Sequence, residues 1–173
     1  MGYNEISTEQ EGDMDQGKFY AFNSFNKDWA LVTAGTIDHF NTMTVSWGGM
    51  GTLWSRPVAT VYVKPCRYTH EFMEKYDYFT VSFFPEKYRG DLQILGSRSG
   101  RDGDKVALTS LTPVAGEFSV TFEEAEHVLV CRKIYRQDLD LSAIPDWAVK
   151  AHYRTEAPHT MYIGEVLNAS SLS

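Results

Sequence analysis

Asn41-Thr-Met-Thr-Val-Ser-Trp-Gly-Gly-Met-Gly51 is the stretch of sequence that decides the fold. From Thr42 to Trp47 small polar residues alternate with larger apolar ones, which is the period of a half-buried β-strand. The hydroxyl side chains then share one face, and the apolar side chains share the other. A row of hydroxyls fits cross-strand pairing on a solvated sheet as well as a polar surface facing a ligand. The glycines that follow indicate a bulge or a close approach of the backbone to something bound.

Outward from this stretch, apolar runs alternate with short turn signals. They predict further strands over Trp29–Ala34, Pro57–Val63, Tyr78–Phe84, Phe118–Phe122, His127–Tyr135 and Thr160–Val166. Short helices are expected over Thr69–Tyr76 with Thr69 as cap, over Glu86–Leu95 closed by Gly96, and over Asp104–Ser110. Six or seven strands with a few peripheral helices predict a small antiparallel β-barrel.

The 173 residues carry a formal net charge of −7, and this charge is unevenly distributed. Residues 1–17 hold five of the 23 acidic side chains and none of the 16 basic ones, so we expect an acidic, flexible N-terminal leader there. Residues 18–173 form the single predicted domain and are nearly neutral. Because no unopposed basic face emerges, binding to nucleic acid is excluded.

Cysteine usage and hydropathy predict a cytoplasmic protein. Cys66 and Cys131 form neither a metal-binding pair nor a disulfide framework, and both are expected to be reduced thiols. Cys131 alternates into a strand core and should be inert, whereas Cys66 lies near a predicted helix N-terminus, which lowers a thiol pKa. Neither a signal peptide nor a membrane-spanning segment is recognisable.

Two stretches have the chemistry of a phosphate site. In Lys64-Pro-Cys-Arg-Tyr-Thr-His70, Arg67 falls at a helix N-terminus, where free N–H groups, the helix dipole and a guanidinium favour an anion. A solvated Arg beside an ordinary Thr cap explains the same pattern. Gly96-Ser-Arg-Ser-Gly-Arg-Asp-Gly-Asp-Lys105 resembles a phosphate loop but lacks the Gly-Lys-Ser/Thr of a Walker motif. A turn into a helix capped at Asp102 or Asp104 accounts for it as well.

No nucleophile–base constellation or metal motif is present. The five histidines are scattered, and His152 and His159, on either side of Pro158, are too irregularly spaced for metal ligands. The residues alone therefore predict a β-barrel with a site for a flat, phosphate-bearing cofactor, which they do not name.

The order of these motifs resembles one family. Asn41–Gly48, Leu53-Trp-Ser-Arg-Pro57, Val63–Thr69, Tyr78–Phe84, Gly96–Lys105 and Met161-Tyr-Ile-Gly-Glu-Val166 are together similar to the flavin reductase-like FMN-binding split-barrel proteins, over residues 18–168. The resemblance implies a six-stranded antiparallel split β-barrel of Greek-key type, mainly β with a few peripheral helices. It also implies a homodimer with FMN bound near the interface.

The resemblance further implies the residues that hold the cofactor. The strand that lies along the isoalloxazine ring is Asn41, Thr42, Met43, Thr44, Val45, Ser46 and Trp47. The phosphate-side segment is Arg67, Tyr68 and Thr69, and the loop that closes over the flavin contains Ser97, Gly100, Asp104 and Lys105. Lys64 departs from relatives that often carry Arg, which keeps a cation but loses the bidentate fork.

The reaction implied is reduction of flavin by NADH or NADPH through hydride transfer to flavin N5. Because the cofactors carry this chemistry, no catalytic side chain is required. No G-x-G-x-x-G unit is present for a Rossmann site, so the nicotinamide would stack over the flavin in an open cleft. Trp47 or Trp54 would line that cleft or pack in the core. Two alternatives stay open: a non-enzymatic FMN electron carrier that docks a redox protein, and a β-barrel binding module without a cofactor.

Overall fold

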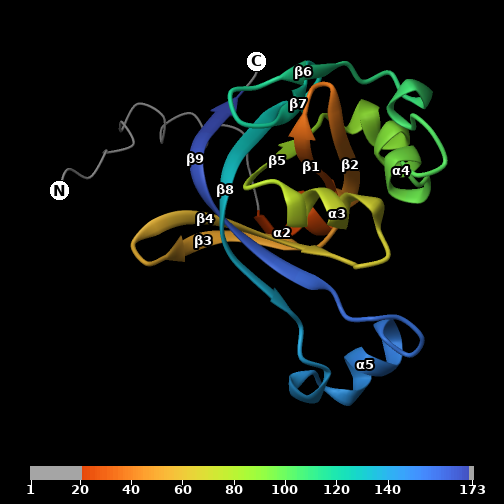
Figure 1. The fold of residues 1–173 in the computed structure, drawn as a ribbon, viewed down its shortest axis with the longest axis vertical. Coiled ribbons are helices and arrows are strands. Elements are labelled where there is room, and N and C mark those ends of the chain that lie inside the picture. The colour runs from red at the N-terminus through yellow and green to blue at the C-terminus, as the bar shows by residue number, and fades with distance from the viewer. Residues whose placement is uncertain (1–20, 172–173) are drawn as a thin grey trace.

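The computed structural model describes residues 21–171, and the predicted acidic leader lies outside them. Its main element is a seven-stranded antiparallel sheet with the strand order β2-β1-β5-β8-β9-β4-β3, beside a two-stranded ribbon of β6 and β7 (Figure 1). The strands are β1 Ala30–Thr36, β2 His39–Val45, β3 Gly48–Leu53, β4 Arg56–Val63, β5 Tyr78–Phe83, β6 Pro113–Ala115, β7 Val120–Phe122, β8 His127–Asp138 and β9 Thr160–Ser171. The mainly antiparallel β fold expected from the sequence is confirmed, with one strand more in the sheet than the six of the resemblance.

Side chains on the two faces of the central strands pack into two separate apolar cores. Ala30, Val32 and Ala34 of β1 join the core inside the curved sheet, together with residues of β2, β4 and β5. Leu31, between them, faces a second core under α4. Because both faces of β1 are covered, the strand reads as a continuous apolar run instead of an alternating one. This burial fixes the register of β1 against both neighbours, Ala30 opposite Val45 of β2 and Phe83 of β5.

Helices close the sheet and differ in detail from the predictions. They are α2 Ala21–Asn26, α3 Tyr68–Lys75, α4 Arg89–Ser97 and α5 Asp146–His152, with single 3₁₀ turns η1 Glu86–Tyr88, η2 Val106–Leu108 and η3 Leu141–Ala143. Thr69 is not the cap of α3, because the helix begins one residue before it and Arg67 is the N-cap. Gly96 lies inside α4 and does not close it, and the helix expected over Asp104–Ser110 is only η2. The sequence did not predict α2 or α5.

The chain turns sharply after β2. The strand predicted to reach Trp47 ends at Val45, and Gly48 starts β3, which pairs with β4 and not with β2. Gly48 packs directly on the Phe25 ring of α2, where any side chain would overlap the ring. The close backbone approach expected at these glycines is therefore found at Gly48, and its partner is a core aromatic.

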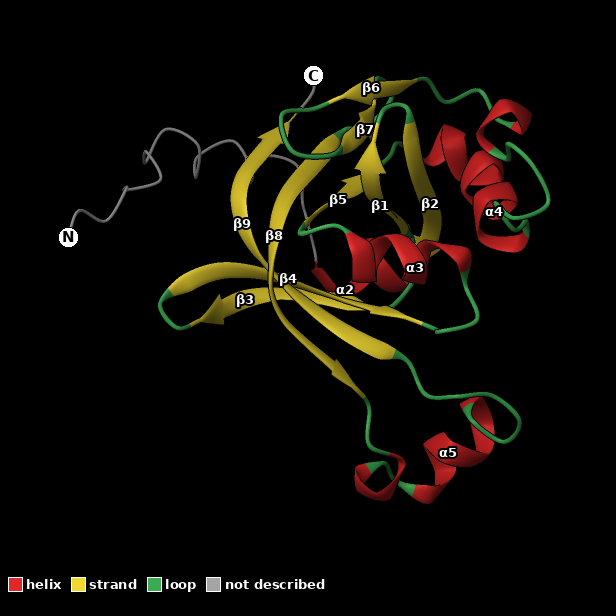
Figure 2. Ribbon diagram, in the orientation of Figure 1, coloured by secondary structure: helices red, strands yellow, loops and turns green. Residues whose placement is uncertain are grey.

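Strands β8 and β9 run on past the barrel and carry a separate segment at its end. Residues 139–159, which we call the arm, contain η3 and α5 and project from the barrel body (Figure 2). The two roots of the arm are joined by the Leu139 N–H donating to the His159 carbonyl at 3.0 Å. Within residues 21–171, no helix has both the length and the apolar character that crossing a membrane requires.

Candidate functional site

A cleft of about 340 Å³ opens where the end of β2, the start of α3 and the arm meet. We call it the β2 cleft. It is lined by Met43, Thr44, Val45, Ser46, Trp47, Tyr62, Lys64, Arg67, His152 and His159. Six of these residues, the run from Met43 to Trp47 and Arg67, are among those that the sequence singled out. Arg67 lies far from the Met43–Trp47 run in the sequence. The two come together because β2 and the connection from β4 to α3 meet at this end of the barrel.

Three side chains of the β2 run make their contacts inside the protein and not with the cleft. Met43 and Val45 are buried in the core, and the Thr44 hydroxyl donates to the Leu92 carbonyl at 2.5 Å. Because β2 is an edge strand of the seven-stranded sheet, one side of its backbone is left without a ladder partner. Such an edge offers N–H and C=O groups to the polar rim of a planar ligand.

Aromatic and imidazole rings form one wall. Trp47 is 39% exposed and lies against two histidines of the arm, with ring centroids 4.9 Å from His152 and 5.0 Å from His159. His159 Nδ1 is 2.8 Å from the hydroxyl of buried Tyr153. The arm therefore holds the indole from one side and leaves part of it facing the cleft.

Two basic side chains of the lining, Lys64 and Arg67, supply positive charge. Arg67 donates through Nη2 to the Gly96 carbonyl at 2.7 Å, which fixes the guanidinium between α3 and α4. Lys64 forms an ion pair with Glu156 of the arm. The cleft thus contains one cation held by a carbonyl and a second one neutralised by the arm.

His159 is neutral near pH 7. Burial lowers its pKa to about 4, and the positive charges of Lys64 and His152 act in the same direction. If the Tyr153 hydroxyl donates to Nδ1, the proton on the neutral ring sits on Nε2 and can be donated. The ring then adds a hydrogen-bond donor to the site without adding charge.

The remaining predicted residues lie elsewhere. Asn41, Thr42, Tyr68, Gly100, Asp104 and Lys105 line a separate cavity of about 780 Å³ beside the β1–β2 turn. The Asn41 amide donates to the Thr69 hydroxyl at 2.7 Å, and both side chains are buried. Thr42 pairs with Thr33 of β1 at 2.8 Å between hydroxyl oxygens. The hydroxyls of Thr42 and Thr69 are therefore used inside the protein, and Thr42 belongs to a buried cross-strand pair instead of a solvated row.

The loop from Gly96 to Lys105 is held by its own contacts. The Lys105 ammonium donates to the carbonyls of Leu95 at 2.8 Å and Arg98 at 3.2 Å, while the side chain is only 4% exposed. Burial, with the charge of Arg67, lowers the pKa of Lys105 to about 8. The Asp104 carboxylate caps η2 by accepting from the Val106 N–H at 3.0 Å. Lys105 and Asp104 thus stabilise the loop.

Two further loop residues have local roles. The Ser97 hydroxyl donates to the Gln93 carbonyl of its own helix at 2.9 Å. Gly100 packs on the Asn41 side-chain oxygen, where a Cβ would overlap it. The loop also contacts β2 through Gly100 and α3 through Arg101, so a turn capped at Asp104 does not by itself account for its contacts.

Sequence reasoning missed the contribution of the arm. The spacing of His152 and His159 suits no metal, and the sequence offers no other role for them. Their common role is to pack on Trp47, and the signal for it is a histidine- and aromatic-rich insertion between the last two strands. Trp54 neither lines the cleft nor packs in the core, because it is 67% exposed in the β3–β4 turn. Cys131 is buried as predicted, and burial raises its thiol pKa.

Comparison with known proteins identifies related domains. Residues 22–172 match the sequence model described as the flavin reductase like domain. No curated protein gives a significant match.

Three solved structures illustrate the shared fold. An FMN-binding protein from Thermus thermophilus is 20% identical, with a TM-score of 0.67, over 90% of this chain and 73% of that one. Flavoredoxin from Desulfovibrio vulgaris (Miyazaki F) is 23% identical, with a TM-score of 0.64, over 83% of this chain and 68% of that one. The NADH:FAD oxidoreductase SgcE6 of Streptomyces globisporus C-1027 is 18% identical, with a TM-score of 0.66, over 87% and 78%.

Proposed function

The chain belongs to the flavin reductase-like family, and from that premise we propose that its β2 cleft binds FMN and serves an oxidoreductase that takes electrons from NADH or NADPH. The observation that carries the proposal is the meeting of the Met43–Trp47 backbone with Lys64 and Arg67 in one cleft. An edge strand, an exposed indole and two cations form a donor set that suits a planar, hydrogen-bonding ring attached to a phosphate.

The site passes a simple test of fit. Its volume of about 340 Å³ lies within the range of roughly 300–1,000 Å³ typical of cofactor sites. The cleft is open, so part of a bound ligand would remain accessible, as stacking of a nicotinamide over a flavin requires. A wholly apolar cleft, or one lined by carboxylates, would not have suited an anionic cofactor.

The cations would hold the phosphate. Arg67 uses one N–H on the Gly96 carbonyl and has further donors for an anion. Lys64 would exchange its partner Glu156 for the phosphate or remain with the arm, so Arg67 is the principal ligand. Ser46 and the backbone of β2 would orient the ring edge, and Trp47 would cover one face of it.

A bound flavin would supply the redox chemistry, accepting a hydride at N5 from the nicotinamide C4. The protein's residues then bind, orient and exclude water, and no general base is needed. Neutral His159 packs beside the indole without adding positive charge to the ring site. Outside the β2 cleft, supporting roles fall to the residues that line the separate cavity, Asn41, Thr42, Tyr68, Gly100, Asp104 and Lys105, and to Thr69 and Ser97.

Two features of the assembly belong to the proposal. We expect a homodimer with the bound FMN near its interface, and its test is the mass in solution measured by light scattering. We also place the protein in the reducing cytoplasm, because Cys66 and Cys131 are both free thiols.

A second candidate is an electron carrier that passes electrons from FMN to a redox protein. The similarity to flavoredoxins of Desulfovibrio vulgaris and Methanosarcina acetivorans favours it. The two candidates share the same cleft and differ in the electron donor.

Anaerobic stopped-flow mixing of the FMN-loaded protein with NADH and, separately, NADPH distinguishes them. Rapid loss of the oxidised-flavin absorbance on mixing with either nucleotide supports the reductase. No bleaching with either nucleotide, together with reduction by a reduced ferredoxin-type protein, supports the carrier. Failure to retain or bind FMN at all would overturn both and favour a binding module without a cofactor.

A further inference from the structure

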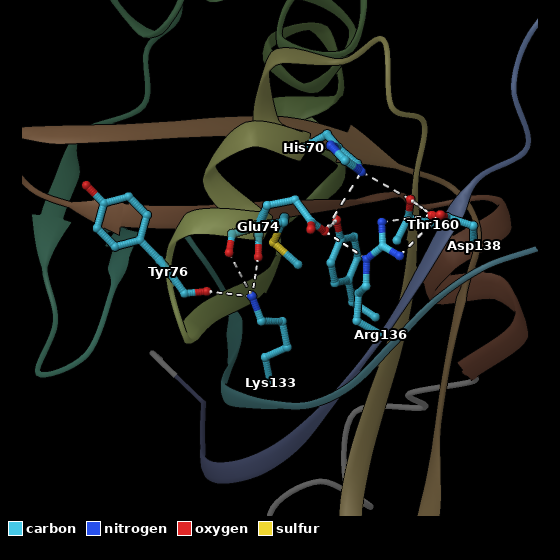
Figure 3. A network of polar contacts seen from close by, with 9 residues as sticks. His70, Glu74, Tyr76, Lys133, Arg136, Asp138 and Thr160 are labelled. Carbon is cyan, nitrogen blue, oxygen red and sulfur yellow. Dashed lines mark hydrogen bonds and ion pairs between the residues drawn. The ribbon is translucent and has the colours of Figure 1, made fainter.

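A polar network joins α3 to both roots of the arm (Figure 3). His70 and Glu74 come from α3, Arg136 and Asp138 from the end of β8, and Thr160 from the start of β9. Asp138 is the last residue before the arm and Thr160 is the first residue after it. The network therefore lies at the only two points where the arm joins the sheet.

The hydrogen-bond directions at Thr160 are determined by its single hydroxyl proton. That proton is donated to Asp138 Oδ1 at 2.6 Å, so the hydroxyl oxygen is left to accept from His70 Nε2 at 3.1 Å. Thr160 is 0% exposed, so water does not compete for either bond. The hydroxyl thus both donates and accepts, and it ties β9 to β8 and to α3 at once.

Glu74 and Lys133 reinforce the same junction. Glu74 Oε1 accepts from the Tyr162 hydroxyl at 2.5 Å and from Arg136 Nε at 3.1 Å, and Arg136 also pairs with Asp138 at 3.0 Å. The Lys133 ammonium donates to the Met73 carbonyl at 2.5 Å and the Tyr76 carbonyl at 3.1 Å, which holds the end of α3 on β8. The helix that begins at Arg67 in the cleft is therefore fixed to the strands that carry the arm.

The residue next to Thr160 is His159, whose ring packs on Trp47 in the β2 cleft. A displacement of Thr160 would be passed directly through one peptide bond to His159, and from its ring to the indole. We propose that Thr160, held by His70 and Asp138, is a positioning residue that sets the His159 ring against Trp47 and thereby the affinity of the cleft for flavin. The affinity part of this inference rests on the proposed function, whereas the ring-positioning part does not.

The chain offers matched variants for a test. Thr160→Val removes the hydroxyl and keeps the shape, while Thr160→Ser keeps the hydroxyl. Thr80→Val is the control, because Thr80 is also buried and its hydroxyl donates to the Val120 carbonyl at 2.6 Å, away from the arm. If the two valine variants lose equal thermal stability, a difference between them in the Trp47 resonance or in FMN affinity is due to the position of Thr160 and not to general destabilisation.

The first readout is the indole N–H resonance of Trp47 in the ¹H–¹⁵N spectrum of the full chain, assigned by its absence in Trp47→Phe. We expect it to shift in Thr160→Val, to return in Thr160→Ser and to stay in place in Thr80→Val. An unchanged resonance in Thr160→Val would overturn the positioning role. This readout needs no cofactor, so it decides the matter even where the protein proves to bind no flavin.

The second readout is the FMN dissociation constant in a double-mutant cycle with His159→Ala. Thr160→Val removes both hydrogen bonds of the hydroxyl, and if about 1 kcal/mol of their free energy is passed to the cleft, FMN binding weakens by roughly fivefold. In the His159→Ala background we expect no further weakening, because the residue through which Thr160 acts is gone. Equal weakening in both backgrounds would show that Thr160 acts independently of His159 and would contradict the proposal.

Discussion

Replacement of Arg67 by alanine is the perturbation that bears most directly on the proposed phosphate site. The substitution removes the guanidinium from the β2 cleft and, with it, the hydrogen bond to the Gly96 carbonyl. Lys64 remains, but it is paired with Glu156. Among the residues that the structure describes, no acidic side chain forms an ion pair with Arg67, so its charge is available to an anionic ligand.

The expected loss follows from these contacts. A hydrogen bond between charged groups contributes about 1.5–3 kcal/mol, and the released Gly96 carbonyl has solvent to accept from instead. We therefore expect FMN binding to weaken by about 1–3 kcal/mol, which is roughly 5- to 150-fold in the dissociation constant. Arg67→Lys should recover part of this loss, since it keeps the charge and loses the fork.

Quenching of flavin fluorescence on titration with protein measures the effect. The same titration with riboflavin, which has no phosphate, is the internal control, and Arg101→Ala is the control variant. Arg101 lies nearby but donates to Glu71 at 2.5 Å, outside the cleft lining. A loss confined to FMN supports the assignment. Unchanged FMN affinity, or an equal loss for riboflavin and FMN, would refute it.

Three further predictions concern stability. The fold lowers the pKa of His159 to about 4 from 6.5, so the unfolded chain binds more protons between these pH values. The free energy of unfolding of wild type relative to His159→Asn should therefore fall as the pH drops from about 6.5 to 4, and a constant difference would contradict the shift. The pKa of Lys105 is lowered to about 8 from 10.5, so the unfolded chain binds more protons between these pH values. The free energy of unfolding in urea of wild type relative to Lys105→Met should therefore rise from pH 8 to 10.5, and a fall over this range would contradict the lowered pKa. Gly100→Ala should lose about 1–3 kcal/mol through overlap with Asn41, whereas Gly49→Ala, which has open space, should melt close to wild type; similar melting of both would rule out the overlap.

Much of the sheet could be predicted because burial imposes a period on the sequence. Pro57–Val63 and Tyr78–Phe84 were located within a residue of β4 and β5, since β-branched and aromatic residues pack on covered strands. The sequence does not predict β3, because its glycines give it no hydrophobic period. The turn at Ser46–Trp47 depends on packing against Phe25 of α2, which no local pattern reveals.

The candidate site was predictable in part. The Met43–Trp47 run and Arg67 line one cleft, because β2 and the connection from β4 to α3 meet at the same end of the barrel. Asn41 and Thr69, which the resemblance assigns to the cofactor, bond to each other and do not line the β2 cleft. His152 and His159 could not be located from spacing alone, since they reach Trp47 only through the geometry of an arm between two strands.

The arm also holds the residues of the β2 cleft in place. Its rings pack on Trp47, its Glu156 holds Lys64, and its roots are tied to α3 by Thr160. Each of these contacts is long-range in sequence and depends on the extensions of β8 and β9 beyond the barrel. The chemistry of the site is therefore a property of the whole fold more than of any motif.

We propose that the β2 cleft, and not the larger cavity beside the β1–β2 turn, holds flavin. An FMN titration followed by ¹H–¹⁵N spectroscopy of the full chain distinguishes the two sites. We expect the resonances that move to belong to Met43–Trp47, Lys64 and Arg67, including the Trp47 indole. Movements gathered instead around Asp38, Phe40 and Val106, which line the other cavity, would contradict it, as would an unchanged spectrum.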